Sequence, residues 1–229
     1  MTLIKSHPSN QMMAVLFGAL PTTRYFISLD PVLNSYYSLG SAVTFLGDFE
    51  LEADLVTTAV TDGLIIGDDH SSSYYFALDG SNFKMFIAGS NSSFAHGGAI
   101  FDGKLHKVKA KLTSTTLEVF LDGSSLGTST VTPYTGANNF LIGNSNSLNF
   151  YFDGIIANVK LTDIATPANS LTFVLGNPTA NTEVNNGVTL TYNNIPTSIR
   201  EEFQLSSDET QWDNISPPTQ QLPAVIEIA

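Results

Sequence analysis

Hydrophobic and polar residues alternate along the middle of the chain, from about residue 35 to residue 161. The clearest run is FELEADL at residues 49–55, where Phe, Leu, Ala and Leu fall on one face and two Glu and one Asp on the other. A period of two is typical of a strand with one buried face. We predict further strands at residues 63–67, 74–78, 83–87, 139–143 and 151–161, the last with a kink at Gly154. Strands about ten residues apart, with no helical period between them, predict an antiparallel sandwich of two sheets.

The stretch DGKLHKVKAKLTSTTLEVFLDGSSLG, residues 102–127, has the pattern of a β-hairpin. Two alternating runs, LHKVKAKL and LEVFL, are separated by the turn-forming tetrad TSTT, and an Asp-Gly pair stands near each end. In the first run three lysines share one face, and His106 falls on the apolar face with Val, Ala and Leu. No nucleophile stands at a useful spacing, so we expect His106 to be a buried core residue rather than a catalytic one.

Composition narrows the classes of function. The 229 residues carry a net charge of −12, with 42% hydrophobic but only 13% charged residues. A field of that sign repels nucleic acid and anionic lipid, so we expect neither as a partner. There is no cysteine, which excludes a disulfide framework and a thiolate metal site. The apolar run MMAVLFGAL, residues 12–20, is shorter than the roughly 20 residues that span a bilayer, so we expect no membrane insertion.

The amino-acid composition of the chain changes near residue 162, where Asn, Thr and Pro become more frequent. Ser198 and Glu201 then form a capping box, which predicts a short helix at about residues 197–204. The Pro-rich tail SPPTQQLPAVIEIA is expected to be extended. We therefore divide the chain into an N-terminal interface segment or first strand (1–34), a sandwich (35–162), and a C-terminal β appendage with the short helix (163–229).

An ordered set of short motifs runs through the sandwich: Asp102-Gly103-x-x-His106-x-Val108, then Asp122-Gly123 and Gly127, then Leu141-Ile142-Gly143, then Phe152-x-Gly154-x-Ile156-x-x-Val159. This set resembles the laminin-G-like, concanavalin A-like jelly-roll domain over roughly residues 35–162. The resemblance implies an all-β, two-sheet antiparallel jelly-roll sandwich. Members of this family mostly bind glycans or proteins through loops at the rim, often with calcium, and some relatives cleave polysaccharides.

The segment VTLTYNNIPTSIREEFQLSSDETQWDN, residues 188–214, resembles modules of bacteriophage fibre and virion-decoration proteins. The favoured hypothesis is therefore a non-enzymatic phage structural protein, as a tail fibre, head fibre or capsid decoration, located on the virion after assembly in the host cytoplasm. Its lectin-like domain would serve adhesion to cell-surface glycans or attachment to other virion proteins. We expect a homo-oligomer that buries the apolar segments at residues 12–20 and 222–228, with a trimer as the favoured symmetry.

Two other functions stay open: a polysaccharide-active enzyme of the same superfamily (a glycosidase or lyase), and a host extracellular carbohydrate-binding module. The enzyme hypothesis depends on Glu50, Glu52 and Asp54, which could supply an acid and a nucleophile. Related glucanases carry Glu-x-Asp-x-x-Glu, which this run does not match, and the sole tryptophan, Trp212, lies outside the sandwich. The structural interpretation, which we prefer, pairs the three carboxylates across neighbouring strands with Lys107, Lys109 and Lys111. We therefore expect no catalytic residue.

Two loops are candidate binding sites. GDDHSSSYY at residues 67–75 and GNSNSLN at residues 143–149 offer hydroxyl, amide and aromatic groups that suit a glycan. The candidate ligand-binding residues are Asp69, His70, Tyr74, Tyr75, Asn144 and Asn146. Calcium is the one cofactor left open, with Asp68 and Asp69 as its candidate ligands. The family resemblance places a calcium-ligating aspartate just before the strand at YYFAL, where this chain has Tyr74, and paired aspartates are also common turn formers.

Overall fold

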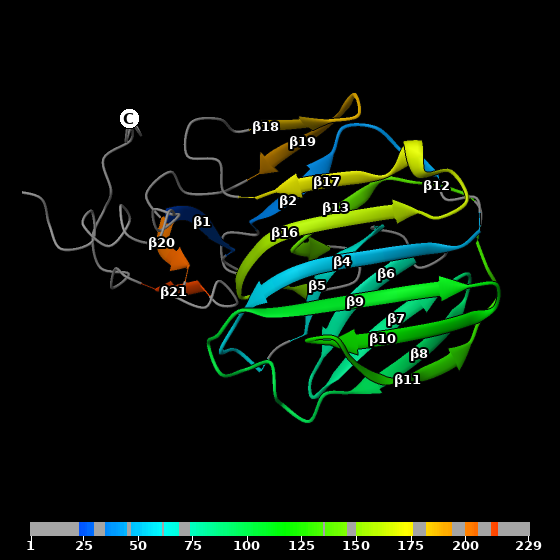
Figure 1. Ribbon diagram of the computed structural model, residues 1–229, viewed down its shortest axis with the longest axis horizontal. Helices are drawn as coiled ribbons and strands as arrows, with labels where there is room; N and C mark the ends of the chain where they lie inside the picture. Colours follow the sequence, from blue (N-terminus) through cyan, green and yellow to red (C-terminus); the bar gives the residue numbers. More distant parts are fainter. Residues whose placement is uncertain are drawn as a thin grey trace, which may run out of the picture.

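The computed structural model is an antiparallel β-sandwich (Figure 1). It describes residues 23–29, 35–44, 47–60, 62–68, 74–134, 136–145, 150–175, 182–193, 200–205 and 212–214. Within these ranges every pair of neighbouring strands runs antiparallel. The predicted two-sheet, all-β sandwich is therefore confirmed.

The sheet nearer the viewer in Figure 1, here the front sheet, is built from β1 (Thr23–Leu29), β4 (Phe49–Val56), β9 (His106–Thr113), β10 (Thr116–Leu121), β11 (Ser124–Thr130), β16 (Gly154–Asp163), β17 (Leu171–Val174), β20 (Arg200–Leu205) and β21 (Trp212–Asn214). The strands follow the order β11-β10-β9-β4-β16-β1-β20-β21, and β17 also pairs with β16. The turn-rich tetrad TSTT closes the β9–β10 hairpin as predicted, with Thr113 paired to Thr116.

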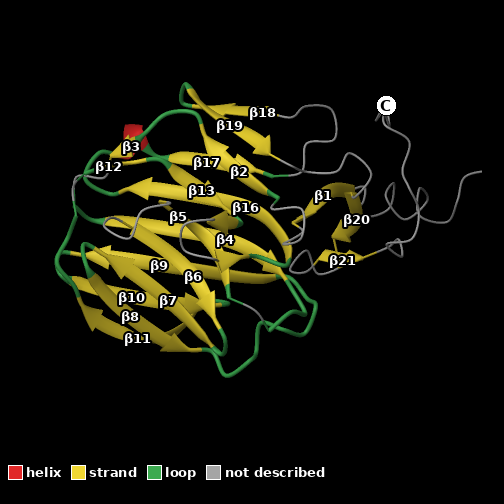
Figure 2. Cartoon of the chain, turned by 180° about the vertical axis from the view of Figure 1, so that it is seen from behind, coloured by secondary structure: helices red, strands yellow, loops and turns green. Residues whose placement is uncertain are grey.

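The back sheet faces the viewer in Figure 2 and is built from β2 (Tyr36–Leu39), β5 (Gly63–Asp68), β6 (Tyr74–Asp79), β7 (Asn82–Ile87), β8 (Ser90–Ala95), β13 (Phe140–Ile142), β18 (Thr182–Asn185) and β19 (Val188–Asn193). Its strands follow the order β18-β19-β2-β13-β5-β6-β7-β8. Two short ladders complete the fold: β3 (Val43–Thr44) with β12 (Ala137–Asn138), and β14 (Asn144–Ser145) with β15 (Phe150–Tyr151).

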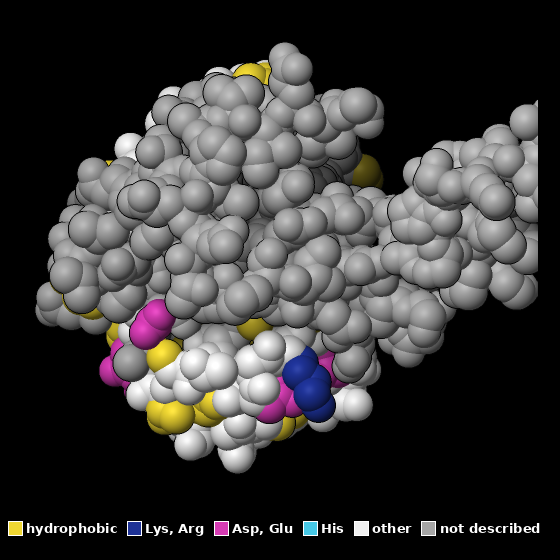
Figure 3. Space-filling view, turned by 90° about the vertical axis from the view of Figure 1, so that its left-hand side faces the viewer, with side chains coloured by type: hydrophobic (Ala, Val, Ile, Leu, Met, Phe, Trp, Pro, Cys, Tyr) yellow, Lys and Arg dark blue, Asp and Glu magenta, His cyan; other side chains and the backbone are white. Residues whose placement is uncertain are grey.

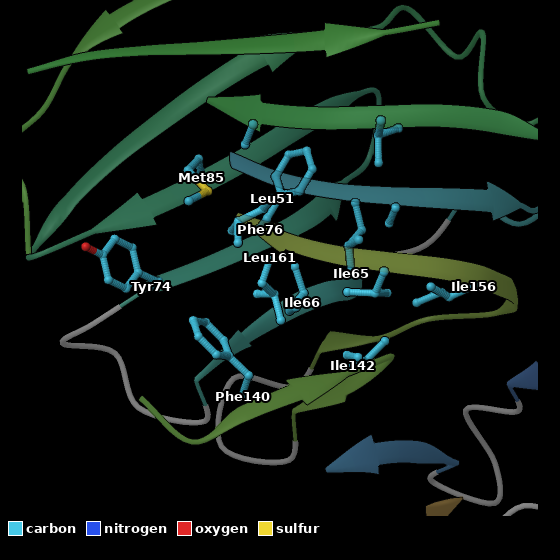
Figure 4. Close-up of a cluster of buried hydrophobic side chains, with 14 of the residues drawn as sticks. Leu51, Ile65, Ile66, Tyr74, Phe76, Met85, Phe140, Ile142, Ile156 and Leu161 are labelled. Carbon is cyan, nitrogen blue, oxygen red and sulfur yellow. The ribbon is translucent and has the colours of Figure 1, made fainter. Parts of the chain in front are cut away.

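The core lies between the two sheets and follows from the period-two pattern. Along β4 every second residue is buried, beginning with Phe49, while the acidic residues between them are half-buried on the outer face. Figure 4 shows Leu51 and Leu161 of the front sheet packed against back-sheet side chains such as Ile66 and Phe76. Burial of such side chains removes apolar area from water, at roughly 25 cal/mol per Å². This term dominates the stability of the fold.

The prediction of a helix at residues 197–204 is wrong. Residues 200–205 form strand β20, which pairs with β1 from Ile27↔Arg200 to Thr23↔Gln204, while residues 197–199 lie outside the described part. A capping box is a local signal, and five cross-strand pairs with β1 outweigh it. The helix in the described residues is a single 3₁₀ turn, Pro167–Asn169.

Strands that follow residue 162 extend both sheets: β17 pairs with β16 in the front sheet, and β19 pairs with β2 in the back sheet. The apolar segments at residues 12–20 and 222–228, on which the oligomer prediction depends, lie outside the described residues. In the described part, no helix has the length and apolar character needed to cross a membrane.

Candidate functional site

The back sheet carries a second apolar layer on its outer face, away from the core. Strand β6 begins with YYFAL, and these five residues are buried, so both faces of this part of the strand are covered. Alternation sends Tyr74, Phe76 and Leu78 into the core, and Tyr75 and Ala77 to the outer face. The outer residues form a separate group, here called the aromatic cluster: Leu64, Tyr75, Ala77 and Phe86, with Leu141 and Phe150 packed against them.

Three aromatic rings define the geometry of this cluster. The Tyr75 and Phe86 rings stack with centroids 5.1 Å apart and planes 6° apart. Phe150 meets Tyr75 edge-on, with centroids 5.5 Å apart and planes at 66°. Phe150 belongs to the short β14–β15 hairpin, which lies against β5. The segment between β13 and β16 thus adds the Phe150 side chain to the outer face of the back sheet.

Polar groups surround the aromatic cluster. The Tyr75 hydroxyl donates a hydrogen bond to Oδ1 of the exposed Asn91, at 3.1 Å. Lys84 Nζ lies 3.4 Å from Oδ2 of Asp79 and 5.7 Å from the centroid of the Phe150 ring. Burial raises the pKa of Tyr75 above its usual value of 10.0, so this hydroxyl is a neutral donor at physiological pH. Tyr75 and Phe86 are only 5% and 7% exposed, so their rings offer a ligand almost no surface. The groups that a ligand can reach are the polar side chains Asp79, Lys84 and Asn91, here called the polar edge of the cluster.

Tyr75 is the predicted site residue that the structure places in this cluster. Asn144 lies on the hairpin that carries Phe150, but it is only 2% exposed, and neither amide atom of its side chain has a hydrogen-bond partner among the described residues. Asp69, His70 and Asn146 lie outside the described residues. Asp68 is half-buried at the end of β5. The described residues contain no group of three His, Cys, Asp or Glu side chains placed to hold a metal ion.

The prediction that Tyr74 binds a ligand is wrong. Its side chain is fully buried in the core, where its ring meets Phe49 edge-on at 5.1 Å and its hydroxyl donates to the backbone carbonyl of Tyr134. Burial raises the pKa of this phenol to about 12. The reason is strand parity: of two consecutive tyrosines on a strand, one must face the core.

Sequence reasoning missed Asp79, Lys84, Phe86 and Asn91. The signal was present in FKMFI at residues 83–87, whose alternation places Lys84 and Phe86 on the face opposite Phe83. A Lys next to a buried Phe on that face indicated an outer surface that is partly apolar and partly polar. Which strand would lie beside it could not be predicted from this run alone.

The front sheet displays the predicted ladder of opposite charges on its outer face. The register pairs Glu50 with Lys111, Glu52 with Lys109, and Asp54 with Lys107, as expected from strand parity. The ion pairs themselves differ from the register. Glu50 binds Lys111 at 3.3 Å, but Glu52 binds Lys160 at 3.3 Å, and the amide of Asn158 donates to Asp54. Lys109 instead lies over the ring of Phe120, 4.7 Å from its centroid.

His106 is not the core residue that the sequence predicted. Its ring lies between two aspartates, with Nδ1 2.8 Å from Oδ2 of Asp122 and Nε2 2.9 Å from Oδ1 of Asp102. The His106 side chain is 12% exposed, whereas those of Asp102 and Asp122 are 40% and 50% exposed. Strand parity does point His106 inward, but it is the first residue of β9, where the ring can turn toward the neighbouring turns. This end of the sandwich lies at the left of Figure 1, and Figure 3 shows basic and acidic side chains together on that side.

Comparison with known proteins decides the family. A family model described as the concanavalin A-like lectin/glucanases superfamily matches residues 34–172, which is more than half of the chain. The chain belongs to this superfamily. The laminin-G-like, lectin-like jelly roll expected from the motifs is thereby confirmed, and the match takes in both the aromatic cluster and the charge ladder. No curated protein matches the sequence.

Solved structures show the same fold at low identity. A protein from Bacteroides ovatus to which carbohydrate binding has been ascribed is 13% identical with a TM-score of 0.57, over 76% of this chain and 59% of that one. A heptameric pentraxin from Limulus polyphemus is 12% identical with a TM-score of 0.52, over 62% and 76% of the two chains. Domains LG4-5 of the mouse laminin α1 chain are 13% identical with a TM-score of 0.50, over 78% and 48%. The match covers less than two thirds of the Bacteroides and laminin chains.

Proposed function

We propose that this superfamily member is a non-enzymatic, lectin-like protein that binds carbohydrate at the polar edge of the aromatic cluster on the back sheet. The observation that carries the proposal is this set of accessible hydrogen-bonding side chains, Asp79, Lys84 and Asn91, beside the buried Tyr75–Phe86 stack. Sugars present a rim of hydroxyls that donate and accept hydrogen bonds, so they pair with amide and charged groups held at fixed positions. The carbohydrate binding ascribed to the Bacteroides ovatus protein supports the same class of ligand.

The test is a glycan array followed by titration calorimetry on the best ligand. We expect Asn91→Ala and Lys84→Ala each to weaken binding about tenfold, the effect of losing one directional contact. Lys111→Ala is the matched control, because Lys111 is also an ion-paired lysine, but on the outer face of the front sheet. Equal losses in Lys84→Ala and Lys111→Ala would place the ligand elsewhere, and a protein that binds no glycan would refute the proposal.

The absence of catalysis is also part of the proposal. A glycosidase needs one carboxyl group kept protonated near neutral pH, beside a second that is ionised. Glu50 and Glu52 are each bound to a lysine on the outer face of the front sheet, so neither stands in the apolar pocket that a general acid requires. A reducing-end assay across a polysaccharide panel is expected to detect no product. Release of oligosaccharides that Glu52→Gln abolishes would show an enzyme instead.

We also propose a setting on a phage virion, as a fibre or decoration protein and as a homo-oligomer with a trimer favoured. Its support is the resemblance of residues 188–214 to virion modules, together with the acidic composition. Light scattering on the purified protein measures the oligomer, and immunogold labelling of purified particles tests the location. A monomer in solution, or particles without label, would contradict these two parts separately.

A further inference from the structure

We propose that the polar edge of the aromatic cluster selects a neutral glycan over one that carries carboxylate or sulfate groups. This inference rests on the proposed function and names the ligand class of that same site. Its basis is the Lys84–Asp79 pair, which stands at the edge of the cluster with a 3.4 Å separation. A lone lysine at this edge would attract acidic sugars, whereas a lysine bound to an aspartate forms a pair with no net charge.

The exposed fractions of the Lys84 and Asp79 side chains also favour a neutral glycan. The Lys84 side chain is 27% exposed and that of Asp79 is 44% exposed, so the carboxylate presents more surface to an approaching ligand than the ammonium. Lys84 is also the sole basic residue on β6, β7 and β8, the strands that carry Tyr75, Phe86 and Asn91. The chain as a whole has a net charge of −12. Both the local and the overall field therefore oppose an anionic ligand.

Hydrogen-bonding chemistry also suits the Lys84–Asp79 pair to a neutral sugar hydroxyl. The Lys84 ammonium only donates hydrogen bonds, and the Asp79 carboxylate only accepts them. A sugar hydroxyl can accept from the first and donate to the second, so one hydroxyl satisfies both partners. A ligand carboxylate or sulfate can only accept, which leaves Asp79 facing a like charge. The Tyr75–Asn91 bond occupies the Asn91 oxygen and leaves its amide N–H groups to donate to a further hydroxyl.

The experiment compares matched oligosaccharides of equal length, one neutral and one with its primary hydroxyls oxidised to carboxylates, at about 20 mM and about 150 mM salt. We expect wild type to prefer the neutral member about tenfold or more at the lower salt. Asp79→Asn leaves the charge of Lys84 unbalanced, so it should shift this preference about tenfold toward the acidic member. Glu118→Gln makes the same change in net charge on the outer face of the front sheet and should leave the preference unchanged.

Two outcomes would overturn the inference while leaving the proposed function standing. The first is a wild-type preference for the acidic oligosaccharide. The second is an equal shift in Asp79→Asn and Glu118→Gln, which would show an effect of overall charge alone. Failure of wild type to bind either member, or any glycan on the array, would instead remove the proposed function, and this inference with it. Thermal unfolding of both variants checks that the fold is intact.

Discussion

The Nδ1 atom of His106 lies 2.8 Å from Oδ2 of Asp122, which joins the first residue of β9 to the turn between β10 and β11. The other ring nitrogen faces Asp102 on the connection that leads from the back sheet to β9. A carboxylate can only accept hydrogen bonds, so both ring nitrogens must donate, and the ring is an imidazolium in this arrangement. Asp122 also accepts from the backbone N–H of Lys107 through its other oxygen. The His106 side chain thus holds two loops to the start of β9.

The contacts of His106 with Asp102 and Asp122, here called the His106 clamp, predict that the free energy of unfolding decreases at alkaline pH. Burial lowers the pKa of His106, but hydrogen bonds and charges of Asp122 and Asp102 together outweigh it, so the net pKa is raised above 6.5. The stabilisation is therefore complete below pH 6.5 and is lost as pH rises through the folded pKa. We expect His106→Gln to lower the free energy of unfolding by about 1 kcal/mol at pH 5.5 and by less at pH 8.5, as measured by urea unfolding.

The pKa of Asp102 sets the lower pH limit of the His106 clamp. The hydrogen bond from His106, then that from the Lys104 backbone, lowers the pKa of Asp102 below 3.8, so its contribution is present above that value and lost at lower pH. Between about pH 4 and pH 6.5 the whole clamp is charged and complete. A His106→Gln penalty of the same size at pH 5.5 and pH 8.5 would contradict the imidazolium assignment.

His96, at the other end of the same connection, should respond to pH in the opposite direction. Burial lowers the pKa of His96 below 6.5, and the backbone of Asn82 and Gly80 opposes this by less. Its Nδ1 accepts a hydrogen bond from the backbone N–H of Gly98 at 3.2 Å, and protonation of the ring would remove that acceptor. The unfolded state therefore binds the proton more readily, and stability decreases as pH falls below 6.5.

The variant His96→Gln tests this prediction through the slope rather than the absolute stability. Its ring packs against Phe83 and Phe101, so the substitution also removes contacts at every pH. We expect the variant to lose less stability than wild type between pH 6.5 and pH 5, because it has no ring to protonate. An acid-side slope equal to that of wild type would show that another group causes the loss.

Strand parity allows the sequence to predict which face of a strand a residue occupies. It does not predict which distant segments of the chain pack together. FELEADL predicted the facing of Glu50 correctly because one face of β4 is apolar and the other charged. YYFAL is apolar on both faces, so nothing in the run showed that Tyr74 rather than Tyr75 enters the core. The two Asp-Gly pairs indicated turns, but not that their carboxylates would converge on His106. The helix prediction at Ser198 was wrong because pairing with β1, more than 170 residues away, outweighed a local motif.

The charge ladder predicts coupling that follows ion pairs rather than strand register. Double-mutant cycles on the free energy of unfolding should give about 0.5 kcal/mol for Glu50 with Lys111, and a similar value for Glu52 with Lys160. The cycle of Glu52 with Lys109 is the matched comparison, since these two are register partners. Lys109 lies over the Phe120 ring instead, so this coupling should be close to zero.

Salt dependence separates the two kinds of interaction in this ladder. Couplings between exposed ion pairs should shrink when the salt concentration is raised to about 1 M, where the Debye length is about 3 Å. Lys109→Ala should keep most of its cost at high salt, because part of that cost is the uncovering of the Phe120 ring. Equal coupling in all three pairs would show that the strand register alone determines the electrostatics.

Two glycines with nearly the same φ allow backbone strain to be distinguished from a steric clash. Gly154 has a φ of +140° and Gly127 a φ of +130°, so an alanine is strained at both positions. A Cβ at Gly154 would lie 2.3 Å from the carbonyl oxygen of Val56, whereas a Cβ at Gly127 would have no atom within 4 Å. Gly154 is also the first residue of β16, where the chain enters the front sheet beside β4, and that backbone cannot move without shifting the β4–β16 pairing.

We therefore expect Gly127→Ala to lower the free energy of unfolding by about 1 kcal/mol, and Gly154→Ala by about 3 kcal/mol or more. The first value is the cost of the positive φ alone, and the difference between the two is the cost of moving Val56 and its strand. Urea unfolding of both variants measures the difference directly, and the kink predicted at Gly154 is the sequence feature being tested. Equal losses would mean that β4 and β16 separate at this end without cost, so that the close approach of the two strands contributes nothing to stability.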